Sequence, residues 1–135
     1  MAKRENIQVA TEFHGGTLTS GGQSARRLIN AVEGARTLWQ PLRRASDFEL
    51  QVEANLSDLE AVTPFLRNVH VYNWADDAAG QTQRLPLESS AAWPLYVEAL
   101  KQIGGERWML LEFVPDDDPA ILAREAAALR ELIGL

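Results

Sequence analysis

The sequence predicts an α/β domain in which a parallel sheet is covered by helices. Short apolar segments with the composition of strands alternate four times with longer amphipathic segments along the 135 residues. The strand segments are apolar almost throughout, which is typical of parallel strands that are buried on both faces. Hydrophobic residues make up 46% and charged residues 24% of the chain. These are ordinary values for a globular protein, so we expect a single domain over residues 1–135.

The predicted strands are short runs rich in β-branched and aromatic residues, each bounded by residues that favour turns. The first strand ends before a glycine pair, Gly15 and Gly16, and the second is stopped by Pro41. Together these features place the four strands near residues 7–13, 35–39, 68–73 and 108–114.

Each predicted strand is followed by a segment whose apolar residues have helical spacing. The first helix is expected to begin within residues 20–23 and to end at Gly34, and the third to open at Trp93 and Pro94 and to stop at Gly104. The side chains expected on the buried faces are Leu28, Ile29 and Val32 in the first helix, Leu56, Leu59, Val62 and Leu66 in the second, Val97, Leu100 and Ile103 in the third, and Leu122, Ala126, Leu129 and Ile133 in the fourth.

Two loops carry further information. The longest, from Asp76 to about Ser90, exceeds the usual length of loops in compact domains, which is typical of functional or disordered segments. The acidic run at residues 116–118 could bind calcium, but helix capping explains it more simply. Asp118 stands in the N-cap position and Pro119 in the first helical position of the last predicted helix.

Composition and charge exclude several classes of protein. The chain contains no cysteine, which excludes disulfides, thiolate metal sites and cysteine nucleophiles. Its apolar runs are too short to span a membrane, and its charged N-terminus lacks the apolar core of a signal peptide, so we expect a cytoplasmic protein. The formal net charge of -6 argues against a nucleic-acid partner, which requires clustered positive charge. Small molecules and other proteins remain as partners.

Polar residues stand at the carboxyl end of each predicted strand, where parallel α/β proteins place their chemistry. These residues are Glu12, Gln40, His70 and Glu112. Length alone favours a small open sheet, whereas the four polar strand ends favour half of a (β/α)₈ barrel. Each residue alone could be an exposed strand end, but the recurrence of the same position predicts a shared site. Two carboxylates, an imidazole and an amide oxygen suit Mn²⁺, Mg²⁺ or Co²⁺ better than a thiophilic metal.

Other side chains near this edge have two interpretations. His14 could contact a substrate or be an exposed loop histidine. Trp39, Tyr72 and Trp74 could form an apolar wall for a sugar ring, and core packing explains them equally well.

Several motifs resemble, in order and spacing, the second half of the sugar phosphate isomerase/epimerase family, whose members are xylose-isomerase-like TIM barrels. The resemblance covers about residues 7 to 134 and assigns this chain strands five to eight of that barrel, as a (βα)₄ half. The motifs that carry it are Glu12-Phe13-His14-Gly15-Gly16-Thr17-Leu18-Thr19, Leu38-Trp39-Gln40-Pro41, Asn68-Val69-His70-Val71-Tyr72-Asn73-Trp74, Arg84-Leu85-Pro86-Leu87 and Leu111-Glu112-Phe113-Val114.

The resemblance implies a metal-dependent isomerase or epimerase acting on a sugar or sugar phosphate. In the family's ketose epimerases, two Glu, an Asp and a His hold a divalent metal, and the two Glu exchange protons with the substrate through an enediolate. Glu12 and Glu112 match the two Glu, and His70 matches the His. Gln40 stands where the family has Asp, so a neutral oxygen replaces a charged one and is expected to weaken metal binding. Arg84 matches a substrate-contacting Arg; with His14, Trp39 and Trp74 it completes the expected substrate contacts.

The absent first half of the barrel leaves two interpretations open. One is an enzyme completed by a second chain, either another copy in a homodimer or a separate N-terminal half. The other is a non-catalytic half-barrel, such as a truncated fragment or an assembly unit. A lone half-barrel would expose inner strand side chains, at a cost on the order of 5–10 kcal/mol. The side chains expected on that face are Val9, Leu38, Val69 or Val71, and Met109 or Leu111.

Overall fold

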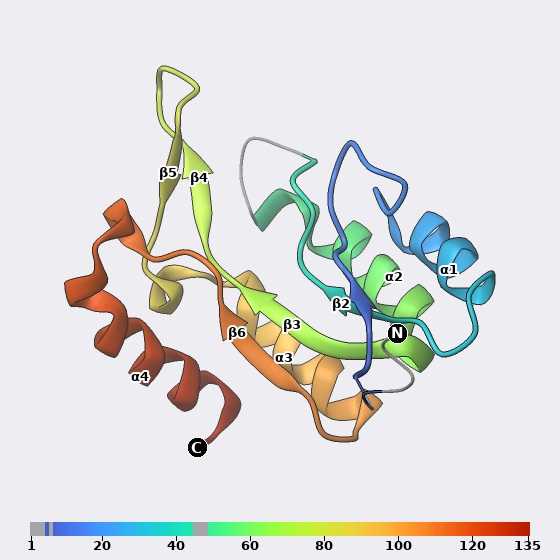
Figure 1. Ribbon diagram of the computed structural model, residues 1–135. Coiled ribbons are helices and arrows are strands. Elements are labelled where there is room, and N and C mark those ends of the chain that lie inside the picture. The colour runs from blue at the N-terminus through green and yellow to red at the C-terminus, as the bar shows by residue number, and fades with distance from the viewer. Residues whose placement is uncertain (1–4, 6, 45–48) are drawn as a thin grey trace. The chain divides into compact units, whose positions relative to one another are not determined.

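The computed structural model describes residues 5, 7–44 and 49–135, so most of the charged N-terminal segment lies outside the described residues. It contains a four-stranded parallel sheet with the order β1-β2-β3-β6 (Figure 1). The prediction of four parallel strands is confirmed, although the first strand is much shorter than expected. The strands are β1 (Ala10–Thr11), β2 (Arg36–Trp39), β3 (Leu66–Val71) and β6 (Trp108–Leu111).

A helix follows each of these strands along the chain, as the apolar spacing predicts. The helices are α1 (Gly22–Asn30), α2 (Val52–Val62), α3 (Ala92–Ile103) and α4 (Leu122–Ile133). Leu66 does not lie on the second helix, as expected, but begins β3, because the segment containing Pro64 forms a 3₁₀ turn (Thr63–Phe65). Val32 and Leu122 are exposed rather than buried, and each lies outside or at the first residue of its helix.

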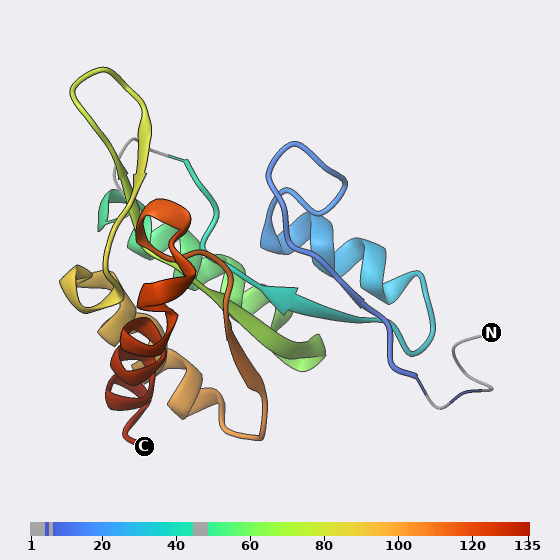
Figure 2. The ribbon, with the colours of Figure 1, turned by 60° about the vertical axis from the view of Figure 1, so that its left-hand side comes forward.

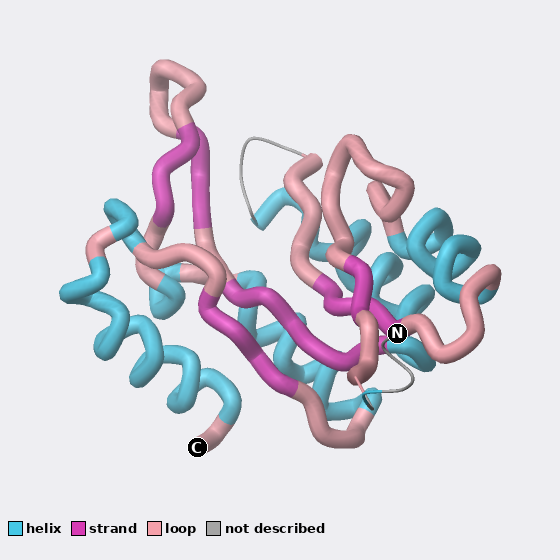
Figure 3. The backbone as a smooth tube through the Cα atoms, viewed as in Figure 1, coloured by secondary structure: helices cyan, strands magenta, loops and turns pink. Residues whose placement is uncertain are grey.

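The long segment expected to be a loop contains a β-hairpin. β4 (Trp74–Asp76) and β5 (Thr82–Arg84) pair antiparallel in a sheet of their own, and a 3₁₀ turn (Leu87–Ser89) follows (Figure 3). The turn of the hairpin is organised by Asp77, whose Oδ1 accepts hydrogen bonds from the backbone amides of Ala79 and Gln81, both at 2.9 Å. The Gln81 hydrogen bond is the main cause that lowers the pKa of Asp77.

The described chain forms two compact units. Unit 1 comprises Met1–Leu42, Glu53–His70 and Gly105–Met109, and unit 2 comprises Arg43–Val52, Val71–Gly104 and Leu110–Leu135. The division between them falls within β3 and within β6.

In unit 1, α1 and α2 approach each other closely at Gly22. A Cβ at this position would lie 2.7 Å from the Cα of Asp58 and 2.9 Å from the Cβ of Ala61, so only glycine fits. The amide of Gly22 donates a 2.7 Å hydrogen bond to Oδ1 of Asp58, which therefore caps the start of α1 from the neighbouring helix. The core of unit 1 includes the fully buried side chains of Phe13, Ala25, Trp39, Val62 and Val69.

In unit 2, α3 and α4 lie side by side (Figure 2). Trp93 and Tyr96 of α3 are fully buried and pack edge to face, and the Trp93 indole N–H donates to the carbonyl of Tyr72 at 2.7 Å. Glu125 of α4 is only 3% exposed; its carboxylate accepts from the amide of Leu87 at 2.8 Å and pairs with Arg124.

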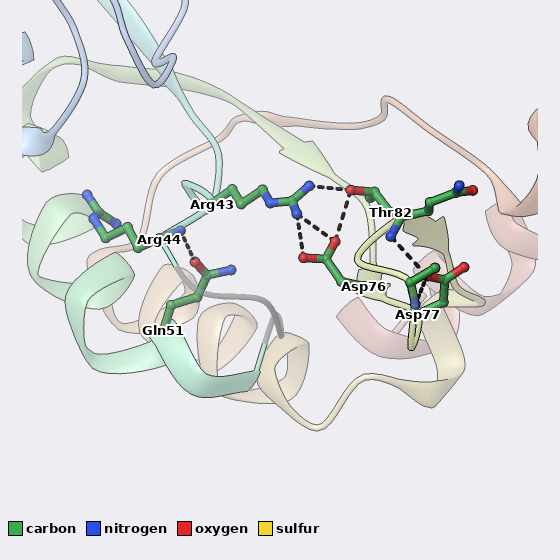
Figure 4. A network of polar contacts seen from close by, with 8 residues as sticks. Arg43, Arg44, Gln51, Asp76, Asp77 and Thr82 are labelled. Atoms are coloured by element: carbon green, nitrogen blue, oxygen red, sulfur yellow. Dashed lines mark hydrogen bonds and ion pairs between the residues drawn. The ribbon is translucent and has the colours of Figure 1, made fainter.

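The hairpin of unit 2 is held by Arg43, a residue from the segment after β2. Its Nη2 donates to both carboxylate oxygens of Asp76 at 2.5 Å, and its Nη1 donates to the Thr82 hydroxyl (Figure 4). The guanidinium also lies 4.6 Å from the ring centre of Trp74. Hydrogen bonds between charged groups are stronger than neutral ones, and here they join two strands of the hairpin to one side chain. The hairpin therefore depends on a contact with a residue thirty or more positions away.

The strand side chains alternate between a covered and an open face. Val69 and Val71 are fully buried, so the expectation that one of them lies on the open inner face is wrong. The intervening residues Asn68 and His70 are half-buried. On β6 the exposed side chains are likewise the even-numbered ones, with Trp108 75% and Leu110 40% exposed, rather than Met109 or Leu111.

In the part of the chain that the structure describes, no helix has both the length and the apolar composition needed to cross a membrane.

Candidate metal centre

Glu12 follows β1 directly, in a segment whose backbone is fixed by the loop after it. The hydroxyl of Thr19 donates a 2.6 Å hydrogen bond to the carbonyl of Glu12, and Thr19 itself is buried. The Thr17 hydroxyl closes the same loop by donating to the carbonyl of His14 at 2.8 Å. The neighbouring Phe13 is anchored in the core. The Glu12 side chain is exposed on this fixed backbone.

His70 is the fifth residue of β3, and its ring is oriented by the residue that ends the neighbouring strand. Nδ1 of His70 lies 3.0 Å from Oε1 of Gln40, which follows β2 directly. Because the amide oxygen can only accept, Nδ1 donates this hydrogen bond, and the neutral form of the ring then keeps its lone pair on Nε2. A histidine held in this way presents Nε2 as a metal ligand.

Glu12 and His70, both in unit 1, each offer a ligand atom within 4.8 Å of the other. Two ligands of one ion, each at roughly 2.0–2.6 Å from it, are separated by a distance of this order. A carboxylate oxygen and an imidazole nitrogen are donors that Mn²⁺ and Zn²⁺ both accept. Glu12 and His70, two of the residues predicted to share a site, therefore lie close enough together to bind one ion.

Gln40 is positioned by a buried residue that sequence reasoning missed. Asn55 of α2 is fully buried; its Oδ1 accepts from the amide of Leu42 at 2.9 Å, and its Nδ2 donates to the carbonyl of Leu42 at 3.4 Å. This pair of bonds fixes the backbone two residues beyond Gln40, whose side chain is only 5% exposed. The signal in the sequence is an asparagine four residues before Leu59, on the apolar face of a predicted helix.

Glu112 lies in unit 2, directly after β6. Its backbone N–H donates a 3.1 Å hydrogen bond to the carbonyl of Val71, so the β3–β6 pairing extends to the residue that follows His70. The Glu112 side chain is half-buried.

The other residues predicted for the site each have partners or packing within their own unit. His14 is exposed, and its Nδ1 lies 2.7 Å from the carbonyl of Gly15. Trp39 is fully buried and Trp74 is 5% exposed, so both rings belong to the packing of their units. Arg84 forms an ion pair with Asp117 and stacks 4.1 Å from the ring centre of Phe113.

The acidic segment after β6 caps a turn as predicted, and two of its residues have an unusual backbone conformation. Asp118 caps the following turn through a 2.8 Å bond from the amide of Ala120, as predicted for an N-cap, although a short 3₁₀ turn precedes α4. Asp116 and Asp117 have φ of 56° and 53°, a conformation that side-chain-bearing residues adopt rarely. The run thus serves helix capping and the ion pair with Arg84.

Comparison of the chain with models of known protein families and with curated proteins found no match.

Proposed function

We propose that this chain is the C-terminal half of a metal-dependent sugar or sugar phosphate isomerase/epimerase barrel, with Glu12, His70 and Glu112 as metal ligands. The observation that supports it is the Glu12–His70 pair, with ligand atoms within 4.8 Å and with the imidazole oriented by Gln40. Such a pair at the carboxyl ends of two parallel strands of one sheet is the arrangement expected of an α/β active site.

Glu112 is the proposed third ligand. His70 and Val71 are covalently joined, and the hydrogen bond from the Glu112 amide to the Val71 carbonyl extends the β3–β6 ladder by one step. Glu112 therefore stands one position beyond β6, at the carboxyl end of the strand, as Glu12 does after β1. Two carboxylates and one imidazole form a donor set that fits Mn²⁺, Mg²⁺ or Co²⁺.

The chemistry follows from this set of residues and from the family resemblance. The bound metal would supply Lewis acidity at the carbonyl and hydroxyl oxygens of the substrate. One of the two side chains, Glu12 or Glu112, would act as a carboxylate and take up the proton next to the carbonyl. The other, protonated beforehand, would donate its own proton on the opposite face or on the neighbouring carbon. Arg84, held by Asp117, is the proposed contact for the substrate's polar groups, and His14 lies on the loop after Glu12.

A second candidate is a non-catalytic half-barrel, and Gln40 is the observation that favours it. A neutral amide stands where the resembling family has a carboxylate, and its oxygen already accepts from His70. The site then has one charge fewer to hold a dication. Measured metal affinity distinguishes the two candidate functions, because a half-barrel without catalytic activity does not require a bound metal.

The test is a thermal melt and a calorimetric titration with MnCl₂ after treatment with EDTA. Saturation at about a hundred times Kd stabilises a binding protein by about 2.7 kcal/mol, roughly 5–15 °C in Tm for a domain of this size. The matched control is Glu60→Gln, which removes one exposed carboxylate from α2. We expect wild type and Glu60→Gln to respond equally; a melting curve indifferent to Mn²⁺ would remove the metal centre and favour the non-catalytic candidate.

Completion of the barrel requires a partner, and we propose a second copy of the chain. β1 and β6 form the two edges of the sheet, so two copies related by a two-fold axis can pair the β1 edge of each with the β6 edge of the other. Apolar side chains on or beside these strands are exposed, namely Ile7 at 62%, Val9 at 55% and Leu110 at 40%. An edge of this kind is an aggregation hazard unless it is paired.

Light scattering coupled to size-exclusion chromatography checks the assembly. We expect a particle of twice the 15.0 kDa of one chain at micromolar concentration. A sharply melting particle with the mass of one chain would exclude the dimer and leave an open sheet that is stable by itself.

A further inference from the structure

Unit 1 contains a second polar site, a pocket at the amino-terminal ends of its strands. The pocket has a volume of about 570 Å³, which is in the range of small-molecule sites. Its lining comes from three strands of the sheet: Gln8 precedes β1, Arg67 and Asn68 belong to β3, and Arg107 and Trp108 lie at the start of β6. All of these residues lie in unit 1.

The pocket is distinct from the candidate metal centre. Glu12, Gln40 and His70 stand at the carboxyl ends of the strands, whereas Arg67 and Arg107 stand at the opposite ends. On β3, His70 lies three positions after Arg67, a rise of about 10 Å along the strand. If two copies close a barrel, this end of the strands opens to solvent at the mouth opposite the metal.

The charge of the pocket is that of an anion site. Two guanidinium groups line it, from Arg67 on β3 and from Arg107 before the neighbouring strand β6, together with one carboxylate, that of Glu106. Partial burial and the positive charge of Arg67 both lower the pKa of Arg107, as expected for two cations held near each other. The net charge of the chain is -6, so two arginines in one pocket stand out from its mostly acidic composition. An anion bound between the two guanidinium groups would offset their mutual repulsion.

The polar and aromatic lining narrows the kind of anion. Gln8 and Asn68 carry amide groups that donate hydrogen bonds to phosphate oxygens. Trp108 is 75% exposed, so its indole offers a bare flat surface to a planar ring. Arginine pairs match the several oxygens of a phosphate better than a single lysine would.

We propose that this pocket binds a phosphate group through Arg67 and Arg107, and that a ring attached to the phosphate stacks on Trp108. The ligand class is a small phosphate monoester that carries an aromatic ring. This site is independent of the metal centre and does not rest on the isomerase proposal.

The experiment is a calorimetric titration of the full chain in EDTA with inorganic phosphate, phenyl phosphate and benzoate, followed in parallel by Trp fluorescence. We expect phenyl phosphate to bind at least fivefold more tightly than inorganic phosphate and than benzoate. Arg67→Gln and Arg107→Gln should each weaken phenyl phosphate at least tenfold. Trp108→Ala should bring phenyl phosphate down to the affinity of inorganic phosphate.

Two controls keep the test specific. Arg26→Gln removes the same charge from the exposed surface of α1 and should change the affinity less than twofold. Glu112→Gln, which is aimed at the metal centre, should bind phenyl phosphate like wild type. Circular dichroism establishes that each variant folds; if one arginine variant fails to fold, the Arg→Lys change at the same position replaces it and should lose at least threefold.

The proposal is overturned if the folded pocket variants bind phenyl phosphate as tightly as Arg26→Gln does. Equal binding of benzoate and phenyl phosphate would also overturn it, because the pocket would then lack the preference for phosphate. If the wild type does not bind Mn²⁺, by contrast, that result contradicts only the proposed metal centre and does not affect the phosphate site.

Discussion

Glu112→Gln is expected to lower the affinity for Mn²⁺ on the order of 100-fold or more, beyond the 10–100-fold typical of residues that only orient a ligand. The amide keeps the size of the side chain but removes its charge, and divalent cations of this class depend on charged oxygen ligands. The backbone bond from residue 112 to the Val71 carbonyl does not involve the side chain, so the strand pairing should survive the change.

Glu12→Gln should have the same effect, since a ligand atom of its carboxylate lies within 4.8 Å of one of His70 in the proposed site. Calorimetry with MnCl₂ measures both losses, and Glu60→Gln controls for the loss of one acidic charge. If Glu12→Gln loses the metal while Glu112→Gln keeps it, the site consists of unit 1 residues and Glu112 is not a ligand.

The sequence predicts the strands of the main sheet because their signals are local. β2, β3 and β6 are β-branched or aromatic runs closed by turn residues, and each lies within or close to its predicted range. β1 is only two residues long, because just Ala10 and Thr11 pair in register with β2, although residues 7–13 have strand composition. The composition of a segment indicates only its preference for strand structure, whereas its pairing also depends on the strand beside it.

The hairpin β4–β5 was not predictable from local pattern. Its strands have three residues each and include Asp76, Thr82 and Gln83, which lack apolar alternation. Arg43 holds them together from outside the hairpin, by bonding Asp76 and lying over Trp74. A contact between residues so far apart in the chain leaves no periodic signal in either segment.

The site residues at strand ends were predictable for a different reason. The carboxyl ends of parallel strands lie at one edge of a sheet, so Glu12 and His70 could be expected to meet once the alternation was known. Asn55 and Thr19 were missed because they act on backbone rather than on a ligand: they fix Leu42 and Glu12 by hydrogen bonds. Buried polar residues of this kind become recognisable only when their partners are known.

Gln40 is the residue whose role changes most between sequence and structure. The sequence suggests a weak fourth ligand, whereas its Oε1 accepts from Nδ1 of His70 at 3.0 Å. In that position it selects the His70 tautomer that presents Nε2. Gln40→Leu should then lower Mn²⁺ affinity about 10–100-fold, and Gln40→Glu should raise it about tenfold, because a carboxylate partner makes the metal-bound imidazole a stronger donor.

Calorimetry gives the two affinities, and ¹⁵N NMR of the His70 ring in the metal-free protein separates orientation from folding. Wild type and Gln40→Glu should show the proton on Nδ1, whereas Gln40→Leu should show a mixture or a shift to Nε2. A purely structural role for Gln40 would change the melting temperature of both variants without moving the tautomer. Opposite changes in affinity, together with that tautomer shift, require the amide to act through the imidazole; equal affinities in the two variants would show that it does not.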